Sequence, residues 1–331
     1  MLQKDQKLHA HVLSDTPELV PIRNGFGEGL LQAARQDDRI VGLCADLLES
    51  TRMEAFAHEF PNRCIEVGVA EQNLASVASG MAAMGKIPFI SSYAMFSPGR
   101  NWEQIRTTIC YNDVPVKIAG SHAGISVGPD GGTHQAIEDL ALMRVLPNMV
   151  VLSPCDVHEA RKATIAAAQT SQPTYIRLAR DKTPVITTEE TPFAIGKASV
   201  LFAPESRTPE VGIIATGALV QSALIVAKEL HAKGIPATVL NMSTVKPLDT
   251  AAIATLAAQA GAIVTVEEHQ VFGGLGSAVA EYLAEHQPTP IAFVGVRDQF
   301  GQSGTPQELI AHYGMDVSAI HRAVASVLLR K

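Results

Sequence analysis

The sequence of 331 residues has few charges, few aromatic side chains and few cysteines. Charged residues make up only 18% of it, and 33 Asp and Glu outnumber 26 Lys and Arg, which gives a net charge of −7. Without an excess of basic residues the chain does not fit a protein that binds nucleic-acid backbones. Because a chain with so few charges exposes little charged surface, we expect it to bury a large area against other chains.

Long apolar segments are missing as well. Residues 1–15 are polar and lack the apolar stretch of a secretory signal, and no uninterrupted apolar run is long enough to cross a bilayer. The cysteines are far apart and form no C-x-x-C pair, so we expect neither a disulfide framework nor a structural zinc site. The four are Cys44, Cys64, Cys110 and Cys155. These features favour a cytoplasmic protein without a membrane partner.

What the sequence does contain is an alternation of short apolar runs with helical segments. Apolar strands separated by single helices predict parallel pairing with helices on both faces of a sheet. Periodicity is lost over Lys182–Phe193, which is typical of a linker. We therefore predict an α/β protein of two tandem domains, each a mostly parallel sheet. The expected parts are an N-terminal tail (1–15), a first domain (16–185), a linker (186–196) and a second domain (197–331).

The predicted strands are apolar runs followed by turn signals or by a helical pattern. In the first domain they are Ile40–Ala45, Cys64–Val69, Ile87–Tyr93, Val114–Ala119, Met149–Leu152 and Thr174–Leu178. In the second domain they are Val211–Ala215, Ala237–Leu240, Ala262–Val266 and Ile291–Val296.

Three stretches with chemically useful side chains follow predicted strands of the first domain. Glu71 begins a helix, where an acid is ordinary because it complements the helix dipole. Tyr93 and Phe96 lie three residues apart and are, taken alone, consistent with core packing. The third stretch, Gly120–Gln135, is a glycine-rich loop with two histidines and an aspartate, which costs stability unless it binds something. Because ligands bind at the carboxyl ends of parallel strands, we predict a ligand site here.

Taken in order, these motifs resemble those of the transketolase family and of its relative deoxyxylulose-phosphate synthase. The resemblance spans nearly the whole chain, and the combination of motifs is more specific than any one of them. In the first domain the motifs are Ala-Glu71-Gln-Asn, Tyr93-x-x-Phe96, His122 and Gly-Pro-Asp130-Gly-Gly-Thr-His134-Gln. In the second they are Thr265-Val-Glu-Glu-His269-Gln-Val-Phe-Gly-Gly-Leu-Gly-Ser and Phe300-Gly-Gln-Ser-Gly.

The resemblance implies a site for thiamine diphosphate. Glu71 matches the glutamate that shares a proton with N1′ of the cofactor's aminopyrimidine, and an apolar pocket favours the neutral form of such an acid. Tyr93 and Phe96 match the aromatic residues around the pyrimidine ring. His122 and His134 match histidines that hydrogen-bond substrate hydroxyls and move protons.

Further matches concern the substrate. Asp130 matches an acid that binds a sugar hydroxyl, and Arg180 matches an arginine that holds a terminal phosphate, although the same guanidinium can hold a sulfonate. Arg177 is expected in a structural ion pair. Ser50 matches a serine near the phosphate end, and Arg100 lies where related enzymes place another phosphate ligand, in a loop of different length.

One family motif is absent. Thiamine diphosphate enzymes hold the diphosphate through a divalent cation on a Gly-Asp-Gly motif of a separate domain, and this sequence has no Gly-Asp-Gly. The resemblance therefore implies the C-terminal subunit of a split transketolase, which is inactive alone. We expect an N-terminal subunit to supply the diphosphate site with Mg²⁺ or Ca²⁺, and a second copy of this chain to complete an α2β2 assembly, with no metal on this chain. The reaction implied is transfer of a two-carbon ketol unit from a phosphorylated ketose to an aldose.

Other functions stay open at this stage. Deoxyxylulose-phosphate synthase usually carries three domains on one chain, and the β subunit of a 2-oxo acid dehydrogenase shares the two-domain arrangement. A non-catalytic assembly or regulatory subunit is disfavoured because Glu71, both histidines and Asp130 are all present. Gly273-Gly-Leu-Gly276 is similar to a dinucleotide fingerprint but lacks its third glycine and its later acid, which favours a structural turn.

Overall fold

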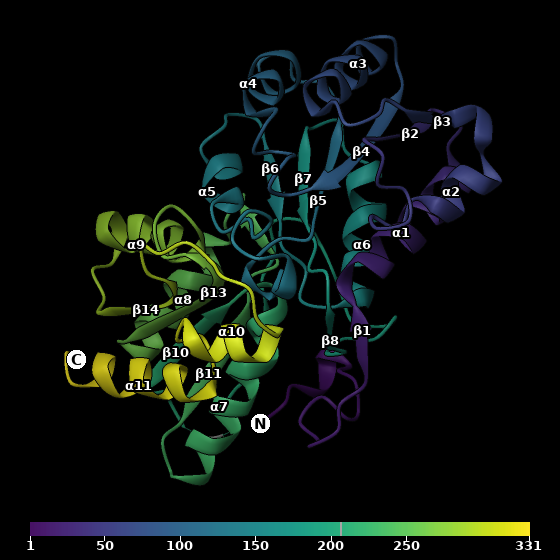
Figure 1. Cartoon of the computed structure of the whole chain (residues 1–331). Coiled ribbons are helices and arrows are strands. Elements are labelled where there is room, and N and C mark those ends of the chain that lie inside the picture. Colours follow the sequence, from purple (N-terminus) through teal and green to yellow (C-terminus); the bar gives the residue numbers. More distant parts are fainter. Residues whose placement is uncertain (206) are drawn as a thin grey trace.

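Two sheets, one in each half of the chain, organise the residues that the computed structural model describes, 1–205 and 207–331 (Figure 1). The first sheet has seven strands, all parallel except one edge strand, β12. Their spatial order is β12 (Thr244–Lys246), β6 (Val150–Leu152), β7 (Thr174–Arg177), β5 (Lys117–Ser121), β4 (Ile87–Tyr93), β2 (Ile40–Cys44) and β3 (Cys64–Glu66). The predicted mixed α/β architecture with parallel sheets is confirmed.

The second sheet has five strands and is also parallel except at one edge, where β9 runs antiparallel. Their order is β14 (Ile291–Val296), β13 (Ile263–Gln270), β10 (Val211–Ala215), β11 (Ala237–Asn241) and β9 (Ser199–Phe202). A separate two-stranded ribbon joins β1 (Leu19–Pro21) to β8 (Lys182–Pro184).

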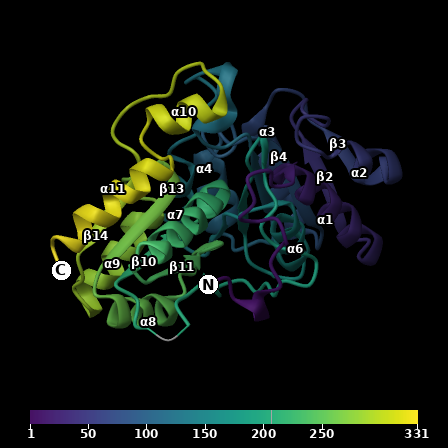
Figure 2. The same cartoon turned by 90° about the horizontal axis from the view of Figure 1, so that it is seen from below.

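Helices cover both faces of each sheet, because each strand buries side chains on both sides. On the first sheet, α1 (Ile22–Gln36) and α6 (Val157–Ala168) cover one face, while α3 (Glu71–Ala83) and α5 (Asp139–Arg144) cover the other. On the second sheet, α7 (Val220–Ala232) and α11 (Val317–Leu328) lie opposite α8 (Thr250–Ala260) and α9 (Leu275–His286) (Figure 2). The shorter helices are α2 (Glu54–Glu59), α4 (Trp102–Gln104) and α10 (Pro306–His312), with one π-helical turn, η3 (Ile105–Cys110).

The two halves of the chain are joined by more than a linker. The strand β12, from the second half, pairs antiparallel with β6 and so completes the edge of the first sheet. In the other direction, the N-terminal residues reach the second half: Gln3 donates its amide to Leu201 O at 3.0 Å, and Val12 is fully buried in the second hydrophobic core. The first fifteen residues, expected as a tail, therefore pack on the second domain.

Three sequence predictions differ from the structure. The stretch predicted as a linker begins as strand β8, and further on Asp156 accepts hydrogen bonds from the amides of Ile186 and Thr187, so this stretch is firmly held. The strand predicted over 114–119 lies instead at Lys117–Ser121, because the backbone turns just before it, with the amide of Val116 bonded to the carbonyl oxygen of Val114 at 2.8 Å. The strand predicted over 64–69 ends at 66, since the backbone turns at 68 with φ +73°.

All four cysteines are free thiols. Burial raises the pKa of Cys44 to about 11 and that of Cys110 to about 12, which makes both thiols unreactive at neutral pH. In the described part of the chain no helix combines the length and the apolar character that a membrane crossing requires.

Helices α1 and α6 pack closely because glycines lie between them. A Cβ atom added to Gly25 would lie 1.9 Å from the carbonyl oxygen of Val157, and one added to Gly29 would lie 2.7 Å from that of Arg161. Backbone atoms cannot move aside as the end of a side chain can. The close packing of α1 on α6 therefore requires glycine at both positions.

We therefore predict that Gly25→Ala destabilises the protein although alanine is the better helix former. The overpacking costs about 1–3 kcal/mol, which exceeds the roughly 1 kcal/mol that alanine contributes in a helix interior. The measurement is urea unfolding of the full chain. The matched control is Gln32→Ala on the exposed side of the same helix, which should change the free energy of unfolding by about 0.5 kcal/mol or less. A Gly25→Ala protein as stable as the wild type would contradict the prediction.

Candidate active site

The three stretches singled out in the sequence meet at the carboxyl edge of the first sheet. Strand β4 ends at Tyr93, β5 ends one residue before His122, and α3 begins at Glu71 after the loop that leaves β3. Parallel strands place their carboxyl ends at one edge, so the positions converge for topological reasons. The predicted convergence is confirmed by the bounds of these elements.

Four of the predicted residues form one aromatic cluster. The rings of Tyr93 and His122 are stacked with their centroids 3.8 Å apart, and Tyr93 also stacks on Phe96 at 6.1 Å. His134 approaches Phe96 edge-on, with 5.4 Å between centroids. His122 is buried, whereas the other three rings keep part of their surface exposed. The cluster thus offers flat apolar area together with two imidazoles.

Glu71 lies beside this cluster as a buried carboxyl. It is 2% exposed, and its Oε2 atom has no hydrogen-bond partner within the chain. The nearest cation is Arg100, whose guanidinium is 3.6 Å from Oε2 and also lies over the Phe96 ring at 5.3 Å. Asn101 fixes the start of the helix by donating to the carbonyl oxygen of Glu71 at 2.9 Å. A buried oxygen without a partner is costly, so this atom fits a ligand that donates a hydrogen bond.

The contacts of Arg100 place it at the Glu71 end of the site. The sequence suggested Arg100 as a ligand for a substrate phosphate, together with Arg180. Arg180 instead lies near His122 and donates to the carbonyl oxygen of Val127 at 3.2 Å. Arg100 therefore contacts Glu71 and Phe96, whereas Arg180 lies near His122, so the two arginines are in different parts of the site.

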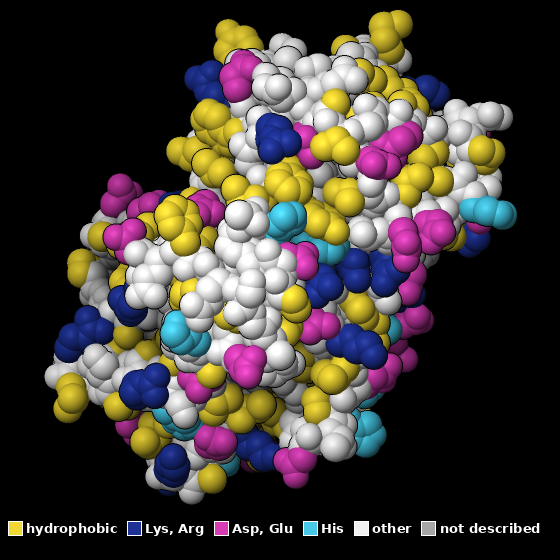
Figure 3. Space-filling model, viewed as in Figure 1, with side chains coloured by type: hydrophobic (Ala, Val, Ile, Leu, Met, Phe, Trp, Pro, Cys, Tyr) yellow, Lys and Arg dark blue, Asp and Glu magenta, His cyan; other side chains and the backbone are white. Residues whose placement is uncertain are grey.

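Around His122 the structure gathers three arginines, of which the sequence suggested only Arg180. Arg23 lies 3.5 Å from the Nε2 atom of His122 and donates to the carbonyl oxygen of Ser50 at 2.5 Å. Burial and the charges of Arg52 and Arg180 lower the pKa of Arg23. Figure 3 shows Lys or Arg side chains next to histidines where the two halves of the molecule meet.

The charge of Asp181 acts on Arg23 from a distance, but these guanidinium groups have no directly paired carboxylate in the described chain. None of the three forms an ion pair with a carboxylate of residues 1–205 or 207–331. The Nε atom of Arg23 is also buried without a hydrogen-bond partner. In a chain of net charge −7 such a group of cations fits an anionic ligand.

The sequence offered little signal for Arg23 and Arg52. Arg23 lies in the first turn of α1, where a cation opposes the helix dipole, and that unfavourable placement is a clue in retrospect. Arg52 has the left-handed φ of +64°, which is uncommon for a residue with a side chain, and no sequence pattern predicts it.

The remaining predicted residues lie around the cluster. Asp130 is exposed at the end of the short 3-10 helix η4 (Ile125–Asp130), on the same loop as His134. Ser50 reaches the arginines through its backbone carbonyl. Arg177 lies apart from these residues and forms the structural ion pair that the sequence predicted, with Asp139 at 2.8 Å.

The glycine motif at 273–276 is a structural turn. The amides of Leu275 and Gly276 begin α9, and both donate at 2.7 Å to the carboxylate of Glu267. The chain's own acid therefore takes the position at which a dinucleotide would place its phosphate. This occupancy excludes the dinucleotide alternative at this turn.

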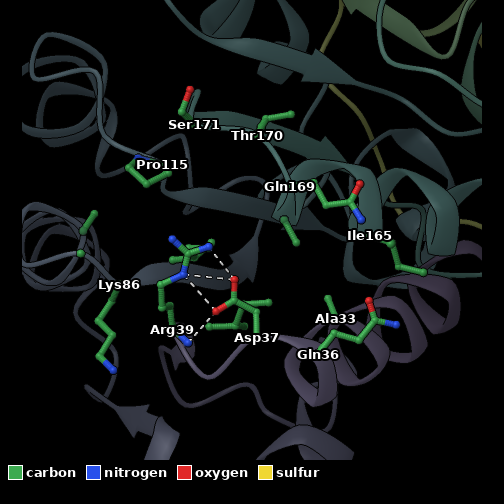
Figure 4. Close-up of a pocket in the computed structure, with 15 residues that line it drawn as sticks. Ala33, Gln36, Asp37, Arg39, Lys86, Pro115, Ile165, Gln169, Thr170 and Ser171 are labelled. Atoms are coloured by element: carbon green, nitrogen blue, oxygen red, sulfur yellow. Dashed lines mark hydrogen bonds and ion pairs between the residues drawn. The ribbon is translucent and has the colours of Figure 1, made fainter.

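A hollow of about 520 Å³ lies at the opposite, amino edge of the first sheet (Figure 4). It is lined by Ile40 and Ile87, the first residues of β2 and β4, and by Thr170. Of its charged residues, Asp37 and Arg39 pair with each other at 2.7 Å, and Lys86 is exposed. None of the lining residues has a buried side-chain polar atom without a hydrogen-bond partner, in contrast to Glu71 and Arg23 at the carboxyl edge. Among the described side chains, no three His, Cys, Asp or Glu come together as metal ligands.

Comparison with known proteins agrees with this geometry. Residues 19–185 match the family "Transketolase, pyrimidine binding domain", and residues 196–320 match "Transketolase, C-terminal domain". A 6-deoxy-6-sulfo-D-fructose transketolase subunit of Clostridium sp. (strain MSTE9) is 42% identical, over 98% of this chain and 97% of the relative. A subunit of the apulose-4-phosphate transketolase of Phocaeicola vulgatus is 37% identical, over 91% of this chain and 96% of the relative.

A solved structure is similar over the same extent. The structure titled "Split gene transketolase, inactive beta4 tetramer" superimposes with a TM-score of 0.86 at 44% identity, and the match covers 94% of this chain and 99% of that chain.

The fold and the two matches define the class, a pyrimidine-binding domain followed by the C-terminal domain of thiamine diphosphate-dependent enzymes. Within that class, the chain belongs to the transketolase family. Its extent is that of the subunits of split transketolases, which are transferases.

The environment of His122 leads to a prediction on stability. Burial and the neighbouring guanidinium groups lower the pKa of His122 from its ordinary value of 6.5 to about 3. Between these values the unfolded chain binds a proton that the folded chain does not, so stability falls as the pH is lowered from 6.5. From pH 7 to pH 5 this one group should cost the folded state about 2 kcal/mol.

Urea unfolding at the two pH values, compared between wild type and His122→Gln, measures this contribution. The variant should lose less stability on acidification, because glutamine does not titrate. An equal loss in both proteins, or a His122 ring resonance that titrates near neutral pH, would contradict the prediction.

Proposed function

We propose that this chain is the C-terminal subunit of a thiamine diphosphate-dependent transketolase, and that its donor is a ketose with a terminal anion. The observation that carries the proposal is the buried carboxyl of Glu71, which has an oxygen without a hydrogen bond beside stacked aromatic rings, with arginines beyond His122 that form no close ion pair in the described chain. Such a site is apolar and acidic at one end and cationic at the other, which matches a cofactor ring followed by an anionic sugar.

Glu71, Tyr93 and Phe96 would hold the pyrimidine end of the cofactor. The Oε2 atom of Glu71 is free to share a proton with a ring nitrogen, and the low dielectric around it strengthens that hydrogen bond. The exposed ring surface of Phe96 and Tyr93 provides a stacking platform. When bound, thiamine diphosphate supplies the nucleophilic carbon that attacks the ketose carbonyl and carries the two-carbon unit to the acceptor.

The histidines and Asp130 would act on the sugar hydroxyls. His122 stays neutral because its pKa is about 3, so one ring nitrogen can accept a hydrogen bond while the other donates one. Ser121 lies 2.9 Å from its Nδ1 atom and helps to fix the orientation of the ring. His134 and Asp130, on the glycine-rich loop, would bind hydroxyl groups further along the substrate.

Arg180, Arg23 and Ser50 would receive the terminal anion of the donor. A phosphate and a sulfonate both present oxygens that guanidinium N–H groups can bind. The name of one relative contains a sugar with a sulfo group, 6-deoxy-6-sulfo-D-fructose, and the name of another contains a sugar phosphate, apulose 4-phosphate. We propose the anion, and not one particular sugar, as the feature that this end of the site selects.

The other half of the site would come from a partner subunit. The sequence has no Gly-Asp-Gly motif, so we propose that an N-terminal subunit holds the diphosphate and its Mg²⁺ or Ca²⁺. Helix α3 begins at Glu71 and carries no other charged residue, while Val69 and Met84 beside it are 71% and 85% exposed. This uncharged surface supports burial against a second copy of the chain or the partner, as in an α2β2 assembly. The similar structure without a partner is titled inactive.

Reconstitution with the N-terminal subunit tests the proposal. The complex with thiamine diphosphate and Mg²⁺ should transfer a ketol unit from a ketose phosphate to an aldose, and this chain alone should not. Glu71→Gln should lower kcat by at least about 100-fold, because an amide cannot exchange the proton. Glu54→Gln, an exposed residue at the start of α2, is the matched control and should keep full activity.

Three results would overturn this proposal. Full ketol transfer by the chain alone would remove the need for a partner, and unchanged turnover in Glu71→Gln would favour a non-catalytic subunit. Decarboxylation of a 2-oxo acid without transfer between sugars would point to a dehydrogenase β subunit, or to a deoxyxylulose-phosphate synthase if pyruvate is condensed with an aldose phosphate.

The anion end makes its own prediction. Arg180→Gln in the reconstituted complex should raise the KM for ketoses with a phosphate or sulfonate by about 10- to 100-fold, the range for a lost charged hydrogen bond. The kcat/KM for a ketose that ends in a hydroxyl should stay within about twofold of wild type. Arg35→Gln, on the exposed surface of α1, is the control. A uniform loss for charged and uncharged donors would show that Arg180 does not select the anion.

A further inference from the structure

Strand β13 carries two adjacent buried glutamates that point to different parts of the molecule. Glu267 accepts from the amides at the start of α9, within its own domain. Glu268 instead accepts a hydrogen bond at 2.6 Å from the amide of Ser126, which belongs to the first domain. Both are at most 3% exposed. Successive residues of a strand face opposite sides of the sheet. Glu267 therefore binds backbone amides of the second domain, and Glu268 binds a backbone amide of the first.

The partner of Glu268 is the base of the loop that carries Asp130 and His134. That base is closed by a bridge between Ala123 and Ala136. Gly124 has φ +89°, and a Cβ atom there would lie 2.3 Å from the Oε1 atom of Glu268. The carboxylate of Glu268 therefore occupies the space that a side chain at position 124 would fill, in direct contact with the base of the loop.

The far side of the loop also rests on the second domain. The side-chain amide of Gln135 donates to the carbonyl oxygens of Ile125 and Gln302, each at 3.0 Å. A Cβ atom on Gly132 would lie 2.6 Å from the carbonyl oxygen of Gly301. The loop is thus held from below by Glu268 and from the side by the Phe300-Gly-Gln-Ser-Gly segment.

Such support matters because the loop has little order of its own. It contains four glycines, at 124, 128, 131 and 132, and fixing each one costs more backbone entropy than fixing any other residue. The regular element within it is the short helix η4, which is broken at Gly128. Without outside contacts, residues on this loop would sample many positions relative to the aromatic cluster.

We propose that Glu268 is a positioning residue for the substrate, acting through the Ser126 amide to hold the loop of Asp130 and His134. The inference rests on the proposed function, which assigns these two residues to the sugar. It gives the C-terminal domain a part in substrate binding although Glu268 itself, buried beneath the loop, is not placed in contact with the sugar.

Two substitutions of Glu268 separate positioning from charge. Glu268→Ala removes the acceptor for the Ser126 amide, whereas Glu268→Gln keeps an acceptor oxygen at the same distance along the side chain. In the reconstituted complex, Glu268→Ala should lower kcat/KM for the donor by at least about tenfold, and glutamine should restore most of it. The cofactor concentration that half-saturates the complex should change less than kcat/KM, since Glu71, Tyr93 and Phe96 lie outside the loop and only His134 of the loop contacts their rings.

Glu267→Ala is the matched control, because it removes a buried acid from the neighbouring position without touching the loop. Its kcat/KM relative to wild type should fall less than that of Glu268→Ala. If Glu268→Ala does not fold, Glu268→Asp serves instead: its shorter side chain keeps the charge but withdraws the oxygen from Ser126, so it should resemble the alanine variant in kinetics.

Hydrogen exchange of the full chain gives a readout that does not depend on activity. The Ser126 amide should exchange faster in Glu268→Ala than in wild type, Glu268→Gln or Glu267→Ala. Faster exchange in a complex that proves inactive as a transketolase would support the contact and refute only the proposed function. Unchanged exchange at Ser126, or equal kinetic losses in the alanine and glutamine variants of Glu268, would overturn the inference.

Discussion

The guanidinium of Arg177 is nearly cut off from water, so its N–H groups need partners that the protein itself supplies. They find one in each of three places: the carboxylate of Asp139 in α5, the carbonyl oxygen of Ala136 at the end of the glycine-rich loop, and the carbonyl oxygen of Glu268 in β13. Removing any of these groups would leave a buried cation short of a partner. The first sheet, the loop and the second domain are thereby tied to one side chain, and the site above them depends on this arrangement.

The site has two unlike ends, and each is unsatisfied within the chain. At one end a carboxyl oxygen of Glu71 is buried without a hydrogen bond, and at the other the Nε atom of Arg23 is in the same state. Proteins rarely leave such atoms unpaired, and the stacked rings of Tyr93 and His122 lie between them. A ligand that donates at one end and carries an anion at the other would satisfy both. The packing of the chain itself therefore holds two unlike, unsatisfied polar groups on either side of the ring stack.

Local pattern predicted some elements well and others poorly, for a physical reason. The strand Ile87–Tyr93 was predicted at its observed bounds because an apolar run and the turn before it are local signals. Strand β13 was predicted to end at Val266 but continues to Gln270, because the acids and the imidazole that follow are buried against segments far away in sequence. The residues of the aromatic cluster come from two motifs that can be found in the sequence, whereas Arg23 reaches the site only through the packing of α1. Contacts between distant segments decide what local periodicity cannot.

The contacts that each half of the chain makes with the sheet of the other half limit how this chain can be divided. If the chain were cut between its halves, the first sheet would lose β12, and the backbone groups of β6 would face solvent as an open edge. The second half would at the same time lose the N-terminal residues that pair with β9. Each fragment would expose backbone that readily pairs with other chains and aggregates. Two domains that look separable in sequence thus depend on each other to cover their sheet edges, so a chain cut at their junction would stay folded only if the two pieces remained bound.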